Sequence, residues 1–331
     1  MRPAPVSAIA ASRAGRGLGG FGMKAIRLHQ RGGPEEFRCE DVAVPEPGPG
    51  EILVKVHAAG VTPSELLWFP TWFLPTTQPR PLPVTPGHEF SGEVAALGAG
   101  VEGLAVGDLV FGLNDWFRDG ALAEYCITAP SYVVPKPASL DHLSAAVTPI
   151  SALTAWQGLI ERGRLARGNR VLVHGGAGAV GEFAVQVARW RGARVTATCS
   201  AANADFVRAL GAHEVIDYRS QDFEKVVREV DLVFDTVGGE TLERSWGLLG
   251  PSGRLVTIAS EGSSSKDPRV RSAFFIVEPD RTQLEDLAGW IDEGVLRPVV
   301  DRVFPLERAR EAFEARHSRG KSVIQVYDPR D

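Results

Sequence analysis

One segment, residues 171–181, constrains the fold more than any other. It places an apolar strand before a glycine-rich turn, Gly176-x-Gly178-x-x-Gly181, and an amphipathic helix after that turn. Glycines let the backbone turn tightly and approach a pyrophosphate, whose charge meets the free N–H groups at the helix start. A second apolar strand follows about 20 residues later, as such a turn requires. This context predicts a dinucleotide-binding turn; the alternative is a tight strand–helix turn without a ligand.

Short apolar strands alternate with amphipathic helices from about Ala145 onward. That alternation is typical of βαβ units, which build a parallel sheet with helices on both faces. We therefore predict an α/β fold in which this region forms a doubly wound, six-stranded parallel Rossmann sheet. The expected strands are Arg170–His174, Arg194–Cys199, Glu214–Tyr218, Asp231–Thr236, Gly253–Ser260 and Ala273–Val277.

The preceding region, from Met23 to about Ser144, is rich in proline and glycine and predicts short strands. Glu51–His57 alternates between apolar and polar residues, and Glu93–Leu97 is a second apolar strand. Beyond Gly294, a strand, a charged helix and a last strand predict a return to this β-rich part. The expected domains are therefore 145–294 and a second one made of 23–144 together with 295–331.

Residues 1–22 differ in composition from the rest of the chain. They contain three arginines, no acidic residue and no periodic apolar pattern. These features fit neither a secretory signal nor a folded element. Two interpretations stay open: a disordered N-terminal extension, which we favour, and an organelle transit peptide.

Charge and cysteine content limit the partners and the compartment. The net charge of -5 argues against binding to nucleic acid or to an anionic membrane surface. No uninterrupted apolar stretch reaches the roughly 18 residues that cross a bilayer. The 3 cysteines are too few and too scattered for a disulfide framework. We expect a cytoplasmic protein whose partner is a small molecule.

The end of the second Rossmann strand indicates which dinucleotide binds. Enzymes that use NAD usually place an acidic residue there to bind the ribose 2′-hydroxyl, whereas this chain has Cys199-Ser-Ala-Ala-Asn203. Without a carboxylate, a 2′-phosphate is not repelled. Ser200 is placed to donate to that phosphate, and Tyr218 to pack on the adenine. The pattern favours NADPH; for Ser200, a helix N-cap is an equal alternative.

Several motifs occur in the order known from one protein family. They are Pro86–Val94, Gly107–Gly112, Gly120–Tyr125, Leu153–Ala155, the glycine turn, Val233–Gly239 and Gly320–Val323. In this order they resemble the medium-chain dehydrogenase/reductase superfamily over nearly the whole chain from Met23. The most similar branch is the zinc-independent, NADPH-dependent quinone oxidoreductase-like (zeta-crystallin-like) group.

The resemblance implies a GroES-like catalytic domain made from both chain ends around a central Rossmann domain, with the substrate between the two. It also implies a homodimer through Ala273–Val277, since an apolar strand at a sheet edge invites pairing with a second copy. The cofactor-binding residues that it implies are Gly176, Ala177, Gly178, Ala179, Val180, Gly181 and Val237.

The pair His88-Glu89 raises the question of zinc, because zinc alcohol dehydrogenases of this superfamily carry Gly-His-Glu here. A catalytic zinc needs three protein ligands. Thr62 stands where those enzymes place their first cysteine, and residues 144–154 contain no Cys, His, Asp or Glu. We therefore expect no metal and interpret His88 and Glu89 as structural or cleft-lining residues.

Without a metal, catalysis is expected to depend on positioning the cofactor hydride against an electrophilic carbon and on excluding water. The resemblance places Thr154 beside the nicotinamide; a buried helical threonine bonded to its own backbone is an equal alternative. It places Thr62 and Glu65 at the cleft, where related quinone reductases commonly carry Asn and Asp. These three residues are the candidate catalytic residues.

The expected activity is hydride transfer from NADPH to a quinone or to an activated alkene or carbonyl, such as an enone or enal. Two alternatives stay open. One is an enoyl-thioester reductase. The other is a catalytically silent, NADPH-binding regulatory protein of the same fold, since fold does not fix function.

A run of large apolar residues, Leu66–Leu74, follows Glu65. A surface loop cannot hide so many apolar groups unless they pack against a cleft or a partner. We predict that Trp68, Trp72 and Phe73 form a wall of the substrate pocket. Ordinary packing within the domain is the alternative.

Overall fold

The computed structural model describes residues 22–259, 262, 264–316 and 318–327. The predicted extension 1–22 lies outside the described residues, apart from Gly22, the first residue of strand β1 (Gly22–Leu28). Within these ranges, no helix has the length and apolar character needed to span a membrane.

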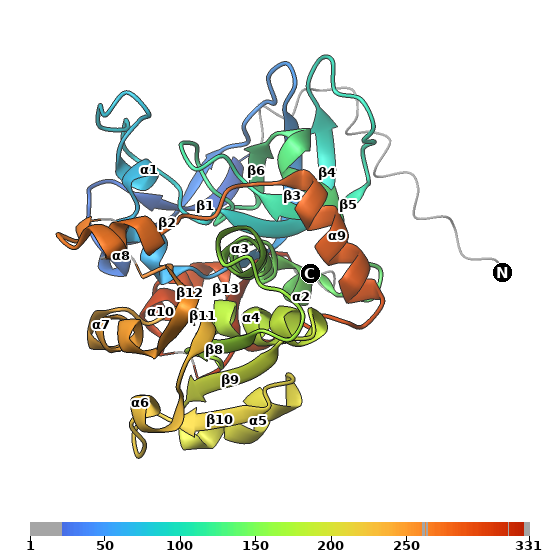
Figure 1. Ribbon diagram of the computed structural model, residues 1–331. Coiled ribbons are helices and arrows are strands. Elements are labelled where there is room, and N and C mark those ends of the chain that lie inside the picture. Colours follow the sequence, from blue (N-terminus) through green and yellow to red (C-terminus); the bar gives the residue numbers. More distant parts are fainter. Residues whose placement is uncertain (1–21, 260–261, 263, 317, 328–331) are drawn as a thin grey trace.

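A seven-stranded sheet forms one part of the molecule (Figure 1). Its order is β13-β14-β3-β4-β5-β7, and β6 pairs with β3. Short helices α2 and α10 pack on this sheet, and β1 pairs with β2 in a separate hairpin. The elements are β2 (Phe37–Ala43), β3 (Ile52–Gly60), α1 (Phe69–Trp72), β4 (Glu89–Leu97), β5 (Leu109–Leu113), β6 (Tyr125–Thr128), β7 (Val133–Pro135), α2 (His142–Ala146), β13 (Val300–Pro305), α10 (Ala309–Glu314) and β14 (Lys321–Gln325).

The second part is a five-stranded sheet in the order β10-β9-β8-β11-β12, with every pair of neighbours parallel. The strand order reverses at β8, as in a doubly wound Rossmann fold, so the predicted fold class is confirmed. The elements are α3 (Pro149–Trp156), β8 (Arg170–His174), α4 (Ala179–Trp190), β9 (Arg194–Cys199), α5 (Ala204–Ala209), β10 (Glu214–Asp217), α6 (Phe223–Val226), β11 (Val230–Asp235), α7 (Gly239–Ser245), β12 (Leu249–Thr257), α8 (Pro268–Ala273) and α9 (Arg281–Asp292).

The predicted sixth strand, Ala273–Val277, does not form a ladder in this sheet. Ala273 ends helix α8, and Phe274 makes only an isolated parallel bridge to Thr257. The N–H of Phe275 donates to the carbonyl of Thr257 at 3.3 Å, and just after the segment the Gln157 amide bonds both the N–H and the C=O of Glu278. Within the segment Phe275 and Val277 are buried and Ile276 is exposed, and the sheet has five strands.

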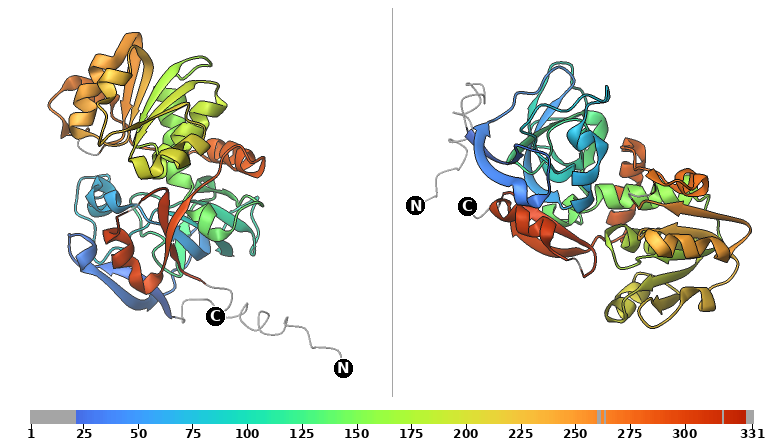
Figure 2. Two further views of the ribbon diagram at one scale, coloured as in Figure 1. Left: turned by 90° about the horizontal axis from the view of Figure 1, so that it is seen from below. Right: turned by 90° about the vertical axis from the view of Figure 1, so that its left-hand side faces the viewer.

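The last two strands return to the first sheet. β14 pairs antiparallel with β3 and parallel with β13, so it lies inside the seven-stranded sheet. Figure 2 shows these red strands beside the blue and cyan amino-terminal strands, while the green to orange Rossmann sheet lies apart from them. The seven-stranded sheet is therefore built from two separate stretches of the chain.

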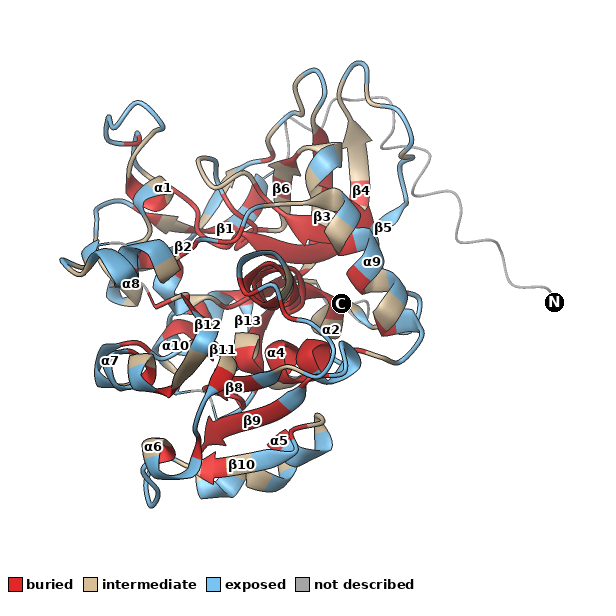
Figure 3. Cartoon of the chain, viewed as in Figure 1, coloured by how far each residue is buried: buried red, intermediate tan, exposed pale blue. Residues whose placement is uncertain are grey.

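One apolar core continues from one sheet to the other. It joins Phe111 and Val134 of the first sheet to Leu153 of α3, Val173 of β8 and Phe183 of α4. In Figure 3 helix α3 lies between the two sheets and is coloured as buried over most of its length. The two parts therefore share one apolar core.

Two side chains of α4 hold the segment that leads from α9 back to β13. Glu182 Oε1 accepts the N–H of Val299 at 3.0 Å, and Gln186 bonds both the N–H and the C=O of Arg297. The side chain of Glu182 is buried, and its Oε2 has no hydrogen-bond partner among the described residues. Burial raises the pKa of this carboxyl to about 8.

This raised pKa predicts that stability falls as the pH rises. The folded protein keeps the Glu182 proton up to about pH 8, whereas an unfolded glutamate loses it near pH ~4.3. The folded state therefore binds more protons between these values, and the free energy of unfolding decreases by at most about 1.4 kcal/mol per pH unit. Urea unfolding from pH 5 to 8 should show a flatter pH dependence for Glu182→Gln than for the wild type. The exposed Glu243→Gln is the matched control, and parallel curves for wild type and Glu182→Gln would contradict the prediction.

Candidate functional site

The glycine turn lies at the carboxyl end of β8, the central strand of the Rossmann sheet. A Cβ on Gly176 would lie 2.9 Å from the Cβ of Ala197, and one on Gly181 would lie 2.0 Å from the carbonyl oxygen of Gly175. Helix α4 begins directly after Gly178, so its first N–H groups, which have no partner inside a helix, sit at this turn. Gly178 is exposed, and Ala179 and Val180 are partly exposed. The turn has the close packing and the free donors that bind a pyrophosphate.

Val237 also lies at this turn. Its N–H donates to Asp235 Oδ1 at 3.1 Å, and its side chain is 53% exposed. A Cβ on Gly175 would meet the Val237 side chain at 3.3 Å. The structure thus brings Val237 next to the predicted cofactor-binding turn.

The carboxyl ends of β9 and β10 lie side by side and carry Ser200 and Tyr218. The N–H of Tyr218 donates to the carbonyl of Cys199 at 3.2 Å, and the Tyr218 ring is 55% exposed. Ser200 precedes a short 3-10 turn, but its side chain makes no capping bond to the backbone. The expected N-cap role is therefore absent, and the Ser200 hydroxyl only accepts a 3.4 Å bond from Asn203.

Two charged residues at this edge were not predicted from the sequence. The Arg219 guanidinium lies 5.6 Å from the Tyr218 ring and donates to its hydroxyl at 3.4 Å. Asp217 accepts bonds from Ser220 and from the Arg219 N–H, and the Ser220 hydroxyl lowers the pKa of this carboxyl. The position of Arg219 directly after Tyr218 was the available sequence signal.

The start of β14 touches the glycine turn. The N–H of Gly320 donates to the carbonyl of Ala177 at 2.8 Å, and Gly320 forms a parallel bridge with Gly178. Gly320 has a φ of +60°, and a Cβ there would lie 2.2 Å from the carbonyl oxygen of Val299. Only glycine fits this close approach between the two parts of the molecule.

The next residue, Lys321, forms a buried ion pair with Glu89. Glu89 Oε2 also accepts the N–H of Ile150 at 2.9 Å, and Oε1 accepts the Thr62 hydroxyl at 3.4 Å. Burial raises the pKa of the Glu89 carboxyl, and the Lys321 ammonium opposes that rise. Thr62 therefore belongs to this polar cluster, through a contact with Glu89.

A second buried polar pair joins Glu65 and His88. Glu65 Oε2 lies 2.9 Å from His88 Nδ1, and Glu65 Oε1 accepts the N–H of Gly87 at 3.0 Å. Glu65 is 0% and His88 is 2% exposed. His88 Nε2 has no hydrogen-bond partner among the described residues. The sequence analysis singled out Glu65 and His88 separately and did not predict their contact.

The aromatic loop divides into two environments. The Trp68 ring lies 6.3 Å from the His88 ring and 5.4 Å from the Trp116 ring, so it adjoins the polar pair. Trp72 is buried in the core of the seven-stranded sheet, and its Nε1 donates to the carbonyl of Leu66 at 2.7 Å. Trp72 is therefore core packing, and its expected role as a pocket wall is corrected. Phe73 stacks on Phe69 at 5.0 Å, away from this pair of indoles.

Thr154 lies on α3 and is buried. Its hydroxyl donates to the carbonyl of Ile150 at 2.6 Å, one helical turn earlier. This bond is the one expected for the alternative interpretation of Thr154, a buried helical threonine bonded to its own backbone.

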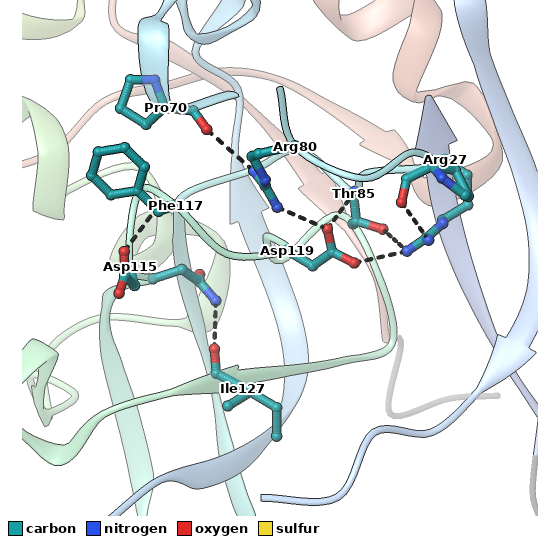
Figure 4. A network of polar contacts seen from close by, with 10 residues as sticks. Arg27, Pro70, Arg80, Thr85, Asp115, Phe117, Asp119 and Ile127 are labelled. Carbon is teal, nitrogen blue, oxygen red and sulfur yellow. Dashed lines mark hydrogen bonds and ion pairs between the residues drawn. The ribbon is translucent and has the colours of Figure 1, made fainter. Parts of the chain in front are cut away.

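An ion-pair network fixes the loop that carries Trp116. Figure 4 shows Asp119 between Arg27 and Arg80; the ion-pair distances are 2.9 and 3.2 Å. Asp119 also accepts the N–H of Thr85, and Asp115 accepts the N–H of Phe117. A cavity of about 440 Å³ beside this network is lined by Arg27, Arg118 and residues of β1 and β6 and lies away from the glycine turn.

The described residues do not provide a metal site. Within the ranges that the structure covers, no group of three or more His, Cys, Asp or Glu side chains is placed to hold a metal ion. Near His88, Glu65 is bonded to the imidazole and Glu89 to Lys321. A three-ligand catalytic zinc does not fit these contacts.

The buried ion pair makes a testable prediction about stability. Lys321→Met keeps the length of the side chain but leaves the Glu89 carboxylate unpaired in the core, which costs about 3–5 kcal/mol. The double variant Lys321→Met/Glu89→Gln removes the unpaired charge and should recover part of that loss. Urea unfolding measures both, with Lys225→Met as the control, because the Lys225–Asp222 pair is exposed. A loss for Lys321→Met as small as that of the control would contradict the prediction.

Comparison with known proteins agrees with this architecture. Residues 48–138 match the family model described as the alcohol dehydrogenase GroES-like domain, and residues 210–324 match the one described as zinc-binding dehydrogenase. The solved quinone oxidoreductase from Coxiella burnetii has a TM-score of 0.84 and 32% sequence identity, over 93% of this chain and 100% of that chain. The predicted combination of a GroES-like part with a Rossmann sheet is confirmed.

Curated relatives extend over most of the chain. The quinone oxidoreductase of Rattus norvegicus is 32% identical and covers 90% of this chain and 95% of its own length. The mitochondrial NAD(P)H oxidoreductase RTN4IP1 of Danio rerio is 32% identical, over 85% of this chain and 84% of its own length. Relatives of this kind support an oxidoreductase that uses a nicotinamide cofactor. The chain therefore belongs to the medium-chain dehydrogenase/reductase superfamily, in its quinone oxidoreductase-like branch.

Proposed function

We propose that the protein uses NADPH, without zinc, to reduce a quinone or an activated alkene or carbonyl. The main support for this proposal is the pair of contacts made at the start of β14. Gly320 bonds the glycine turn, and the adjacent Lys321 pairs with Glu89, so the polar cluster of the first sheet adjoins the cofactor-binding turn. Relatives with the printed name quinone oxidoreductase support the substrate class.

In this reaction the residues of the chain bind and orient the cofactor and the substrate. When bound, the cofactor supplies the hydride. The glycine turn binds the pyrophosphate with its backbone N–H groups. Trp68 and Trp116 offer flat apolar faces beside His88, and such faces stack on a quinone or enone and exclude water. We expect the rate to depend on orientation of the two reactants and on exclusion of water from the site.

The preference for NADPH rests on the edge formed by β9 and β10. Ser200 supplies a hydroxyl there, and Arg219 supplies an exposed cation beside Tyr218. A guanidinium binds a phosphate with two parallel N–H bonds, whereas it gains little from a ribose hydroxyl. Asp217 places a negative charge at the same edge and opposes this preference. We therefore expect a moderate preference for NADPH over NADH.

Removing the cation should reduce that preference. Arg219→Ala loses a charge-assisted bond to the 2′-phosphate at an exposed site, so kcat/KM for NADPH should fall about 10-fold. The value for NADH should change by less than about 2-fold, because NADH has no 2′-phosphate. Steady-state kinetics with both cofactors measure the ratio, and Arg228→Ala, at the opposite end of the sheet before β11, is the control. An equal loss with both cofactors would show that Arg219 acts on folding or on the adenine instead.

The proposed activity is tested by NADPH oxidation with a panel of quinones, enals, enones and enoyl-CoA esters. We expect turnover with quinones or with enones and enals, and the same rate after dialysis against a chelator. Turnover confined to enoyl-CoA esters would favour an enoyl-thioester reductase. Tight NADPH binding without turnover would favour a regulatory protein. Stoichiometric zinc and loss of activity on chelation would contradict metal independence.

Two further proposals concern assembly and compartment. The apolar edge Ala273–Val277 is proposed to pair with a second copy of the chain, with Ile276, 59% exposed, on the free face; light scattering tests the dimer. A cytoplasmic location is proposed from the three scattered cysteines, although relatives such as the Danio rerio protein are mitochondrial by name. Fractionation of cells that express the full chain decides between the two compartments.

A further inference from the structure

Resting on the function proposed above, we propose that His88 is the proton donor of the reaction and that Glu65 is its positioning residue. The proposal assigns the step that completes a reduction: an anion formed on the substrate by hydride addition must gain a proton. It starts from two observations, the buried contact between Glu65 and His88 and the unpartnered second nitrogen of the same imidazole.

Glu65 holds the imidazole in one orientation. It lies on a 3-10 turn, Pro63–Leu67, directly after β3, and His88 directly precedes β4. Both carboxylate oxygens face N–H groups, one of the Gly87 backbone at 3.0 Å and one of the imidazole Nδ1 at 2.9 Å. An ionised carboxylate can only accept, so His88 Nδ1 carries a hydrogen in either protonation state of the ring.

Gly87 contributes to this orientation. It has a φ of +93°, and a Cβ there would lie 2.8 Å from the side chain of Leu122. No other residue fits this backbone and this space. The N–H that holds Glu65 and the imidazole that follows it in sequence are therefore fixed together.

The other ring nitrogen, Nε2, is the one free to exchange a proton. A buried polar atom without a hydrogen bond costs about 1–3 kcal/mol. Nε2 is such an atom among the described residues, although every polar atom of its partner Glu65 is satisfied. The ring lies 5.5 Å from that of Trp116 and 6.3 Å from that of Trp68, the pair proposed to stack on the substrate. A substrate oxygen placed against these indoles would supply the missing partner.

The proposed step balances in atoms and charge. A C–H bond of NADPH breaks as its hydride adds to the β-carbon of an enone, so NADPH is oxidised to NADP+ and the enone is reduced to an enolate with the negative charge on oxygen. The N–H bond at His88 Nε2 breaks, the enolate oxygen gains the proton, and the imidazole becomes neutral with its hydrogen on Nδ1. The resulting enol converts to the ketone in water, and solvent returns a proton to Nε2. With a quinone, the proton goes to the hydroquinone anion.

The other polar groups near His88 are engaged in contacts of their own, so His88 is the group that can donate the proton. The charged groups around it are Glu65, Glu89 and Lys321. The Lys321 ammonium is held by the Glu89 carboxylate, and Glu65 accepts two bonds. The Thr62 hydroxyl is directed to Glu89, and the Thr154 hydroxyl to its own helix. Of these groups, the imidazole alone has a nitrogen without a hydrogen-bond partner among the described residues.

Kinetics of matched variants provide the first test. His88→Gln keeps a polar side chain but removes the general acid, so kcat with 3-penten-2-one should fall about 100-fold. NADPH affinity, measured by fluorescence titration, should stay unchanged. Glu65→Gln should cause a smaller loss and displace the pH profile of kcat. His142→Gln is the control, because His142 is a half-buried histidine bonded to Ser91 and outside this cluster. Equal kcat and pH profiles for His88→Gln and the wild type would overturn the proposal.

A second test does not depend on turnover. In the cofactor-free protein labelled with 15N-histidine, the resonance lost in His88→Gln should show a hydrogen on Nδ1. In Glu65→Gln that hydrogen should no longer be fixed on Nδ1, while the His142 resonance stays neutral near pH 7, because burial lowers the pKa of its imidazole to about 4. A hydrogen fixed on Nε2 at all pH values would overturn the assignment of His88. If the wild type fails to oxidise NADPH with every substrate of the panel, the proposed function itself is overturned.

Discussion

The buried pair of Glu89 and Lys321 is the contact on which the rest of the arrangement depends. Charges inside a protein are costly unless they are paired and hydrogen-bonded. Glu89 meets this condition through the Thr62 hydroxyl, the Ile150 N–H near the start of α3 and Lys321 at the start of β14. The carboxylate also leaves no room for a side chain at Gly60, because a Cβ there would lie 2.3 Å from it.

Contiguous patterns in the sequence were sufficient to predict most of the fold. The strand, glycine turn and helix around Gly178 were predictable because every group that they need lies in one contiguous stretch, from Arg170 to Trp190. The segment Ala273–Val277 has the apolar character of a strand and was predicted as the sixth one, but Ala273 ends helix α8 and the segment makes a single bridge to Thr257. Apolar composition could not predict that the ladder stops there.

The candidate site was predictable only in part, for a similar reason. Trp68 and Trp72 are four residues apart in one apolar run, yet one adjoins His88 and the other lies in the core. The difference comes from the turn between them, which the run of apolar residues does not encode. The contact of Glu65 with His88 depends on how the 3-10 turn after β3 meets the start of β4. Residue types indicated these side chains, and only the tertiary structure pairs them.

The position of β14 inside the seven-stranded sheet has a consequence for how such proteins exchange parts. Because the chain leaves that sheet after β7 and re-enters it at β13, no single crossover separates the two parts. Grafting a different nucleotide-binding half requires two junctions. The second must preserve the hydrogen bond of Gly320 to Ala177 and that of Val299 to Glu182. A replacement half must therefore match this protein in sequence or geometry at both junctions.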